Sequence, residues 1–438
     1  MLPMNTSLEL SKKANEVMPG PHSNLPGYEL FRPIYFARGS GGHLYDVDGN
    51  DFLDYMCGLG AGVIGYNIPE VVEVLKNQID NMYYLDAARR SPLEIELAEK
   101  LVHHIPCAEK VRYLLSGTEA VQLVIRLARA YNKRPYFIRF DGHYHGWLDN
   151  VMGGMVDPYP QGPPHALYTP DDLFASKGRD VAAEKQSFKL PWNEIDVLES
   201  VLEEYGDQVS LIIMEPINAN AGVCMPRPGY MERVRELCDK YGIILCFDEI
   251  ITGFRVGLSG AQGYLGVTPD ICTLGKGIAG GIPFSVVGGK AEIMDLLTDR
   301  KVVGAGTFNG YPLGVSAALA TVKYLEKDNG VFYNRLEKVQ NKLMDGLREI
   351  AQKYSEPMLL QGAPGVFFYQ FLDKDVAYNV SDWYPDSDHA KQERLREELF
   401  VNGILILFRA RWYISGSHTE EDVDRTLEIV DRAMKKIL

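Results

Sequence analysis

Residues 209–249 read VSLIIMEPINANAGVCMPRPGYMERVRELCDKYGIILCFDE and contain two apolar runs separated by an amphipathic segment. Residues 209–214 and 243–247 have the length and composition of buried strands, and residues 229–242 have helical spacing. A strand, a helix and a second buried strand in this order are typical of a parallel sheet covered by helices. The stretch therefore predicts an α/β fold with a mostly parallel, doubly wound sheet.

The same alternation of helix and strand patterns precedes this stretch. Helical spacing occurs at residues 92–105 and 118–131, and short strand patterns occur at residues 111–115 and 135–140. After about residue 325 the chain changes to long amphipathic helices with short strands. The last of these helices has Thr419 as its predicted N-cap, acidic residues in its first turn and lysines in its last turn, as the helix dipole favours.

These changes of pattern predict a large domain and a small one. We expect residues 1–65 to form an N-terminal segment and part of the small domain, and residues 66–325 to form the large domain. Residues 326–438 would complete a small α+β domain, so both chain ends contribute to it.

The composition excludes several classes of protein. The chain has 438 residues, of which 46% are hydrophobic and 24% are charged, and its formal net charge is −14. Nucleic-acid binding needs a concentrated basic surface, which this balance does not offer. The apolar runs are too short to span a membrane, and the N-terminus has no secretory apolar region. Six cysteines without a C-x-x-C pair indicate reduced thiols, so we expect a cytoplasmic protein.

Three segments of this predicted domain offer groups for a ligand. Ser116 and Glu119 fit a capping box that opens a helix, and Gly117 between them lets the backbone approach an anion. Asp248 ends one buried strand, and Glu215 ends another, with Asn220 a few residues further along. Ligands bind at the carboxyl ends of strands in open α/β sheets. Each feature also fits an ordinary structural role, as a helix cap or a strand end.

Lys276 lies between two glycines in the segment CTLGKGIAGGIP, residues 272–283. A lysine in such a loop is usually a solvated surface residue. The small neighbours, however, leave room beside the amine for a flat and bulky group.

The segment FDGHYHGW, residues 140–147, places two histidines around Tyr144. The histidines could bind a metal, but no third ligand has suitable spacing, so we expect no metal site. A ring in this loop could stack on a planar cofactor or pack in the core. The segment GAGVIG, residues 60–65, matches a dinucleotide fingerprint, but it follows a hairpin pattern and not a buried parallel strand, so we do not expect a dehydrogenase.

Taken in order, SGTEA, FDGHYHGW, MEP, FDEIITGFR, TLGKGIAGGIP and GTFNG resemble the class III aminotransferases. These are fold-type-I enzymes that depend on pyridoxal 5′-phosphate (PLP), and the branch of glutamate-1-semialdehyde aminomutase is the most similar one. The resemblance implies that Lys276 forms a Schiff base with PLP and that Asp248 pairs with the pyridine nitrogen. It also implies that Lys276 then acts as base and acid, through a pyridoxamine phosphate intermediate.

The resemblance also assigns the other cofactor residues. Tyr144 and Ile250 would pack on the two faces of the ring, and Glu215 and Asn220 would lie near cofactor and substrate. The phosphate would be held by Ser116, Gly117 and Thr118, and by Thr307 of the neighbouring subunit. The last contact implies a homodimer with shared active sites.

The sequence departs from this family at substrate positions. Gly58 and Leu59 stand where the aminomutases have a serine and a tryptophan, which disfavours isomerisation. Gly27 stands where many relatives have an arginine that binds a substrate carboxylate. Arg409 and Arg411 near the C-terminus are the remaining candidates for that role, although either could equally be an ion-pair partner.

We therefore expect an aminotransferase that moves an amino group from a small-molecule donor to a carbonyl acceptor. The favoured acceptor is an aromatic or β-keto acid held by Arg409 or Arg411. An amino-sugar or carrier-bound acyl acceptor is one alternative, and a 2,1-aminomutase of the glutamate-1-semialdehyde type is another. A binding module without catalysis would have lost Lys276 or Asp248, and both are present.

Overall fold

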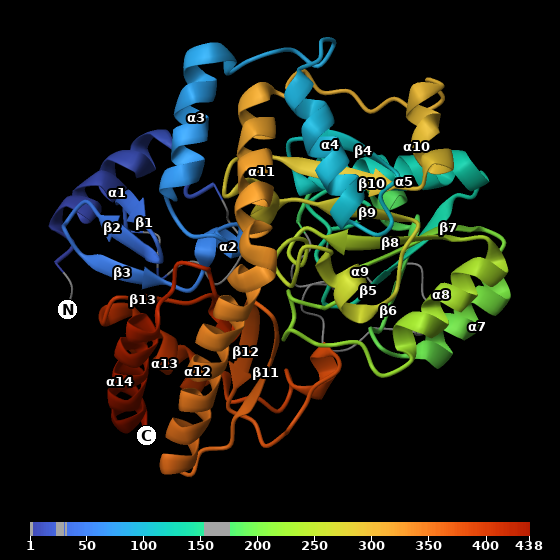
Figure 1. Cartoon of the computed structure of the whole chain (residues 1–438). Coiled ribbons are helices and arrows are strands. Elements are labelled where there is room, and N and C mark those ends of the chain that lie inside the picture. The colour runs from blue at the N-terminus through green and yellow to red at the C-terminus, as the bar shows by residue number, and fades with distance from the viewer. Residues whose placement is uncertain (1–2, 23–29, 31–32, 153–175) are drawn as a thin grey trace. The chain divides into compact units, whose positions relative to one another are not determined.

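The fold is described from a computed structural model, in which residues 3–22, 30, 33–152 and 176–438 are described (Figure 1). The chain divides into two compact units. Unit 1 comprises Met1–Pro69, Gly330–Val376 and Asp386–Leu438, and unit 2 comprises Glu70–Asn329 and Ala377–Pro385. Each unit is described by itself.

Unit 2 is built on a sheet in which seven strands are described. Their order across the sheet is β4 (Lys110–Leu114), β10 (Ser285–Gly289), β9 (Ile271–Leu274), β8 (Ile244–Glu249), β7 (Val209–Met214), β5 (Tyr136–Phe140) and β6 (Ser187–Leu190). Strand β10 is antiparallel to β4 and β9, and the other neighbouring pairs are parallel. The prediction of a mostly parallel α/β sheet is confirmed, and β10 is the exception that the alternating pattern did not predict.

The helices described in unit 2 are α3 (Pro69–Met82), α4 (Pro92–His104), α5 (Gly117–Asn132), α6 (Val181–Glu184), α7 (Ile195–Tyr205), α8 (Tyr230–Tyr241), α9 (Gly260–Leu265), α10 (Ala291–Thr298) and α11 (Pro312–Leu325). Of these, α4, α5, α8, α9 and α10 contact strands of the sheet. Helix α5 packs against β7, β8, β9 and β10, and α4 lies beside α11 (Figure 1). Seven residues of α5 are buried, and each large aliphatic one contributes about 1.5–3 kcal/mol by burial.

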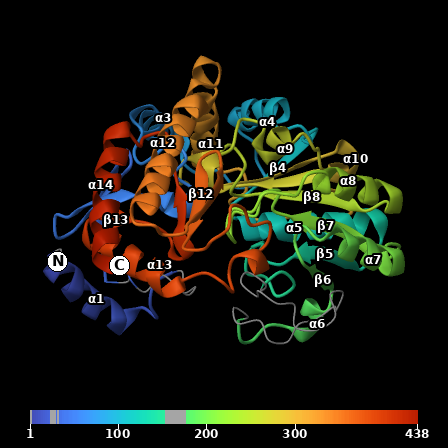
Figure 2. The same cartoon turned by 90° about the horizontal axis from the view of Figure 1, so that it is seen from below.

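Unit 1 joins both ends of the chain. One sheet has the order β1 (Phe36–Ser40), β2 (His43–Asp46), β3 (Asp51–Asp54) and β13 (Ile404–Leu405), and a second has β11 (Leu359–Ala363), β12 (Val366–Gln370) and β14 (Arg411–Tyr413). The helices are α1 (Asn5–Val17), α2 (Cys57–Gly60), α12 (Val331–Lys353), α13 (His389–Val401) and α14 (Glu420–Ile437). Helix α12 packs beside α14 (Figure 2), and Thr419 caps α14 as predicted. In the described ranges, no helix has both the length and the apolar character needed to cross a membrane.

Candidate active site

The parallel strands of unit 2 bring five of the predicted residues to one edge of the sheet. Ser116 follows β4, Tyr144 follows β5, Glu215 follows β7, Asp248 lies at the end of β8, and Lys276 follows β9. These strands run in the same direction, so their carboxyl ends meet at the same edge. That edge is where open α/β sheets bind ligands.

The start of α5 offers an anion site. Ser116 Oγ accepts a hydrogen bond from the Glu119 amide at 3.3 Å, and Glu119 Oε2 accepts one from the Ser116 amide at 3.1 Å. This is the predicted capping box. The amides of Gly117 and Thr118 are in the first turn of the helix, where amides have no acceptor within the helix. The Ser116–Gly117–Thr118 segment can therefore donate to a phosphate.

Asp248 is held by three hydrogen bonds and is buried. Its Oδ2 lies 2.7 Å from His145 Nδ1, and its Oδ1 accepts from Thr273 Oγ1 at 3.0 Å and from the Ile250 amide at 3.1 Å. The sequence led us to expect no metal site at the two histidines, and stacking or core packing for a ring of this loop, but it did not predict this pairing. Among the described residues, no group of three or more His, Cys, Asp or Glu side chains has the geometry of a metal site.

The side chain of Ile250 lies between two glycines of the site. A Cβ atom built on Gly117 would be 3.1 Å from Ile250 Cδ1, and one built on Gly275 would be 2.9 Å from the same atom. Ile250 therefore lies against both the start of α5 and the backbone that leads into Lys276. Lys276 itself has a left-handed backbone, with φ at +45°, which is uncommon for a residue with a side chain.

Glu215 organises the loop that carries Tyr144. Its Oε1 accepts from the Tyr144 amide at 2.7 Å and from Asn220 Nδ2 at 2.8 Å, while its own amide donates to His143 Nδ1 at 2.9 Å. Burial raises the pKa of the Glu215 carboxyl, and burial together with the nearby Asp248 charge raises the pKa of the Tyr144 phenol. Glu215 thus fixes the position of Tyr144 through its backbone, and Asn220 bonds to the same carboxyl oxygen.

Three other predicted residues do not lie at the ends of these strands. Thr307 lies in an exposed loop of unit 2, where its carbonyl accepts from the Ala87 amide at 3.0 Å. Arg409 and Arg411 belong to unit 1, in which their guanidinium groups lie 5.2 Å from the Phe408 ring and 5.3 Å from the Tyr413 ring. Gly27, at the position of the missing arginine, lies outside the described residues.

Comparison with known proteins identifies the family. Residues 27–408 match the family described as aminotransferase class-III, which is most of the chain. The chain belongs to the class III aminotransferases. It is an enzyme of this PLP-dependent family, and the resemblance predicted from the ordered motifs is confirmed.

The proteins similar to this class III enzyme include an aminomutase and transaminases. A glutamate-1-semialdehyde 2,1-aminomutase from Ignicoccus hospitalis is 37% identical over 445 residues, which cover 99% of this chain and 100% of the relative. The crystal structure of an omega-transaminase from Sphaerobacter thermophilus has a TM-score of 0.91 at 29% identity and covers 99% of this chain and 98% of its own. A transaminase with PLP bound has a TM-score of 0.87 at 26% identity, with 100% and 99% covered. The curated relative favours the aminomutase alternative over the aromatic or β-keto acid aminotransferase that we expected.

The cluster fits PLP by the chemistry of its groups. The first amides of α5, with two hydroxyl groups beside them, suit a phosphate. Asp248 offers a buried carboxylate for a cationic ring nitrogen, and Lys276 offers an amine. The glycines at 117 and 275 leave Ile250 in place, where a larger residue would displace it.

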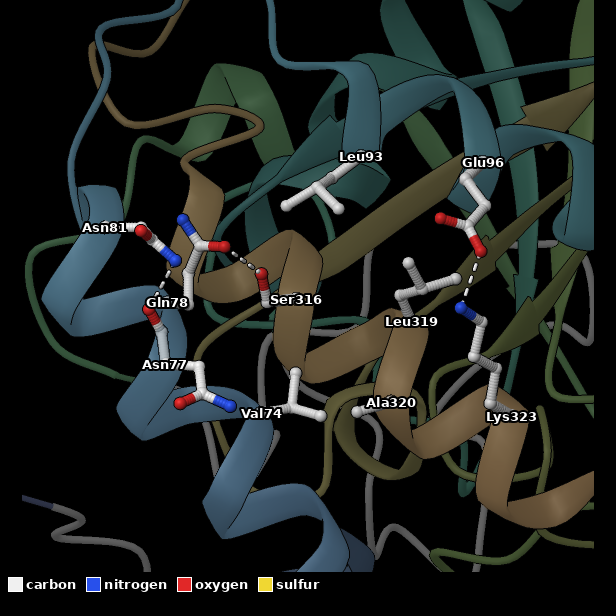
Figure 3. Close-up of a pocket in the computed structure, with 10 residues that line it drawn as sticks. All are labelled: Val74, Asn77, Gln78, Asn81, Leu93, Glu96, Ser316, Leu319, Ala320 and Lys323. Atoms are coloured by element: carbon white, nitrogen blue, oxygen red, sulfur yellow. Dashed lines mark hydrogen bonds and ion pairs between the residues drawn. The ribbon is translucent and has the colours of Figure 1, made fainter.

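A separate groove of about 250 Å³ lies between α3, α4 and α11 (Figure 3). Two pairs of its polar side chains bond to each other: Ser316 Oγ donates to Gln78 Oε1 at 3.1 Å, and Lys323 Nζ lies 2.6 Å from Glu96 Oε1. None of the predicted site residues lines this groove.

Proposed function

We propose that this class III enzyme moves an amino group between two adjacent carbons of one substrate, as a 2,1-aminomutase acting on glutamate 1-semialdehyde does. The observation that carries this proposal is the full-length similarity, at 37% identity, to a relative of that name. The coarser activity, PLP-dependent transfer of an amino group, is common to both candidate reactions considered below.

In this proposal, two residues do the proton chemistry. When bound, PLP supplies an electron sink for the negative charge that develops at the substrate carbon. Asp248 keeps a proton on the ring nitrogen, and the hydrogen bond from His145 Nδ1 keeps the carboxylate oriented toward it. Lys276 Nζ would hold the cofactor until the amine of the substrate displaces it. The freed amine of Lys276 would then accept the proton from the substrate carbon that bears the nitrogen and donate it again in a 1,3-proton shift.

The remaining residues bind and orient. Ser116, Gly117 and Thr118 would hold the phosphate, and Tyr144 and Ile250 would pack on opposite faces of the ring. The assignment of Tyr144 is supported by the hydrogen bond from its amide to Glu215 Oε1, which is 2.7 Å long and holds the loop in place. The assignment of Ile250 is supported by its close approach to Gly117 and Gly275.

A second candidate is transfer between two molecules, with an aromatic or β-keto acid acceptor bound by Arg409 or Arg411. It is supported by Gly58 and Leu59, which replace the serine and tryptophan of the aminomutases. Both residues have left-handed backbones, with φ of +58° and +59°, and the strain of Leu59 is of the kind that persists at functional sites. The similarity to the omega-transaminase supports this candidate as well.

One experiment separates the two candidates. The holoenzyme is incubated with glutamate 1-semialdehyde alone, and separately with L-glutamate or L-alanine plus a β-keto or aromatic keto acid, while products and visible spectra are followed. Isomerisation without a second substrate is the expected result. Turnover that needs a separate donor, with conversion of that donor to its keto acid, would overturn the aminomutase proposal in favour of the second candidate.

We also propose that two copies of the chain share their active sites, with Thr307 of the partner subunit completing each phosphate site. The exposed position of Thr307 supports this arrangement. Location in the cytoplasm stays a prediction from composition.

A further inference from the structure

Glu249 is a second buried acid, next to Asp248, that the mechanism does not use. Its side chain is fully buried. Successive residues of a strand point to opposite faces of the sheet, so the Glu249 side chain lies on the opposite face from that of Asp248. Burial raises the pKa of the Glu249 carboxyl. A carboxylate in such a position is costly unless hydrogen bonds satisfy it.

Four hydrogen bonds satisfy both oxygens of Glu249, and all four donors are neutral. Oε2 accepts from the Ala261 amide at 2.5 Å and from Thr252 Oγ1 at 2.9 Å. Oε1 accepts from the amide and the side-chain nitrogen of Gln262, at 3.2 and 2.9 Å. A Cβ atom on Gly260, whose φ is +61°, would overlap Oε2, so the chain approaches the carboxylate as closely as a glycine allows.

These bonds close the segment Ile250–Gly260, which leaves the end of β8 and returns to α9. The Glu249 carbonyl accepts from the Gly253 amide at 2.8 Å, so backbone and side chain of one residue hold the start of the segment. Its first residue is Ile250, whose amide donates to Asp248 and whose side chain lies against Gly117 and Gly275. A cap for the six-residue helix α9 would not by itself require a buried charge.

We propose that Glu249 is a positioning residue of the cofactor pocket. By binding Thr252, Ala261 and Gln262, it holds the Ile250 side chain against the cofactor ring and keeps the Ile250 amide bonded to Asp248. This inference rests on the proposed roles of Asp248 and Ile250, and it is independent of which substrate the enzyme takes.

The test compares Glu249→Gln with Asp270→Asn. Asp270 is also a buried carboxylate, and it accepts from the Leu245 amide at 2.8 Å and from Arg235 Nη1 at 2.9 Å. It precedes β9, so it lies at the opposite end of the same strands. For each apoenzyme we would measure the Tm and the Kd of PLP, and for each holoenzyme the pH midpoint of the visible absorption band. These measurements need no substrate, so they do not depend on the proposed reaction.

Glutamine has one acceptor oxygen where glutamate has two, so Glu249→Gln leaves donors of the segment without an acceptor. We expect the Kd of PLP to rise about tenfold, because Ile250 is held less firmly. We also expect the pH midpoint of the visible absorption band to rise, because the hydrogen bond from the Ile250 amide to Asp248 becomes weaker. In Asp270→Asn the Tm should fall while the Kd stays within about twofold. A Glu249→Gln protein with a lowered Tm but a wild-type Kd and midpoint would overturn the proposal.

If Glu249→Gln does not fold, Thr252→Val decides the question. It removes one donor, keeps the shape of the side chain and leaves the carboxylate in place. We expect its Kd of PLP to rise about threefold, and an unchanged Kd and pH midpoint would overturn the proposal.

Discussion

His145 Nδ1 lies 2.7 Å from Asp248 Oδ2, and both side chains are buried. The two residues are 103 positions apart in the chain. Because Nδ1 faces the carboxylate, Asp248 fixes which ring nitrogen of His145 carries a proton, and His145 in turn restricts how the carboxylate can rotate.

This pair predicts the effect of Asp248→Asn. A neutral amide cannot hold a proton on the ring nitrogen, so conversion of the bound substrate should slow by about 10²–10³-fold, measured by stopped-flow absorbance with glutamate 1-semialdehyde. Thr273→Val, which removes only a hydroxyl bonded to Asp248 Oδ1, is the matched control and should slow it far less. Equal losses in the two variants would contradict the assigned role of Asp248.

Gly146→Ala should weaken PLP binding. Gly146 has φ of +98°, and its Cβ would lie 2.6 Å from Thr118 Oγ1, so alanine would push against the proposed phosphate segment. The control is Gly266→Ala, where φ is +72° and no atom lies within 4 Å. Both changes carry a backbone cost of about 1 kcal/mol in the left-handed region. Titration of the apoenzymes should show a raised Kd of PLP for Gly146→Ala alone, and a similar Kd in both variants would contradict the prediction.

Shared active sites predict complementation between two inactive variants. In a heterodimer of Lys276→Ala and Thr307→Ala chains, one site has both lesions and the other has neither. Random exchange of equal amounts should therefore restore about a quarter of the wild-type sites. Activity is measured after mixing and subunit exchange, with each variant incubated alone as the control. Failure to exceed the summed activity of the separate variants, with heterodimers demonstrated, would exclude the shared site.

The stability of unit 1 should depend on pH through His43. Its Nδ1 lies 2.8 Å from Asp51 and its Nε2 lies 3.2 Å from Asp422. The hydrogen bond to Asp422 is the largest cause that raises the pKa of His43. Burial alone would raise the pKa of Asp422, but its hydrogen bonds with His43 and Thr419 lower that pKa to about 2. The contribution of charged His43 is fully present below pH 6.5, its ordinary value, and is lost as the pH rises through its raised pKa.

Chemical unfolding of the wild type and of His43→Gln measures this contribution. The difference in free energy of unfolding should be about 1 kcal/mol near pH 5 and smaller near pH 9. For Asp422→Asn the sign is opposite: its contribution is present above pH 3.8 and is lost as the pH falls toward about 2. A difference for His43→Gln that grows with pH would contradict the assignment.

The sequence predicted those features of the structure that depend only on residues close together in the chain. The capping box at Ser116, the cap at Thr419 and the strand that delivers Asp248 each depend on a few adjacent residues, and the structure contains all three. The bond between His145 and Asp248 and the bond from the Tyr144 amide to Glu215 join different strands, so no local pattern reports them. The roles of Thr307, Arg409 and Arg411 stay predictions, because they depend on a second subunit or on the placement of unit 1.

The position of β10 has a consequence for how the protein is made. Strand β4, which leads into Ser116, has β10 as its neighbour in the sheet, with Leu114 paired to Ser285, and Ser285 Oγ donates to the Ser116 carbonyl at 2.8 Å. During synthesis, β4 leaves the ribosome long before the strand that will hold it. The phosphate segment therefore cannot reach its final form until more than half of the chain is available, and long-range pairing of this kind is slow. Cofactor capture should be among the last events of folding, and a nascent chain that stops before Ser285 should not retain PLP.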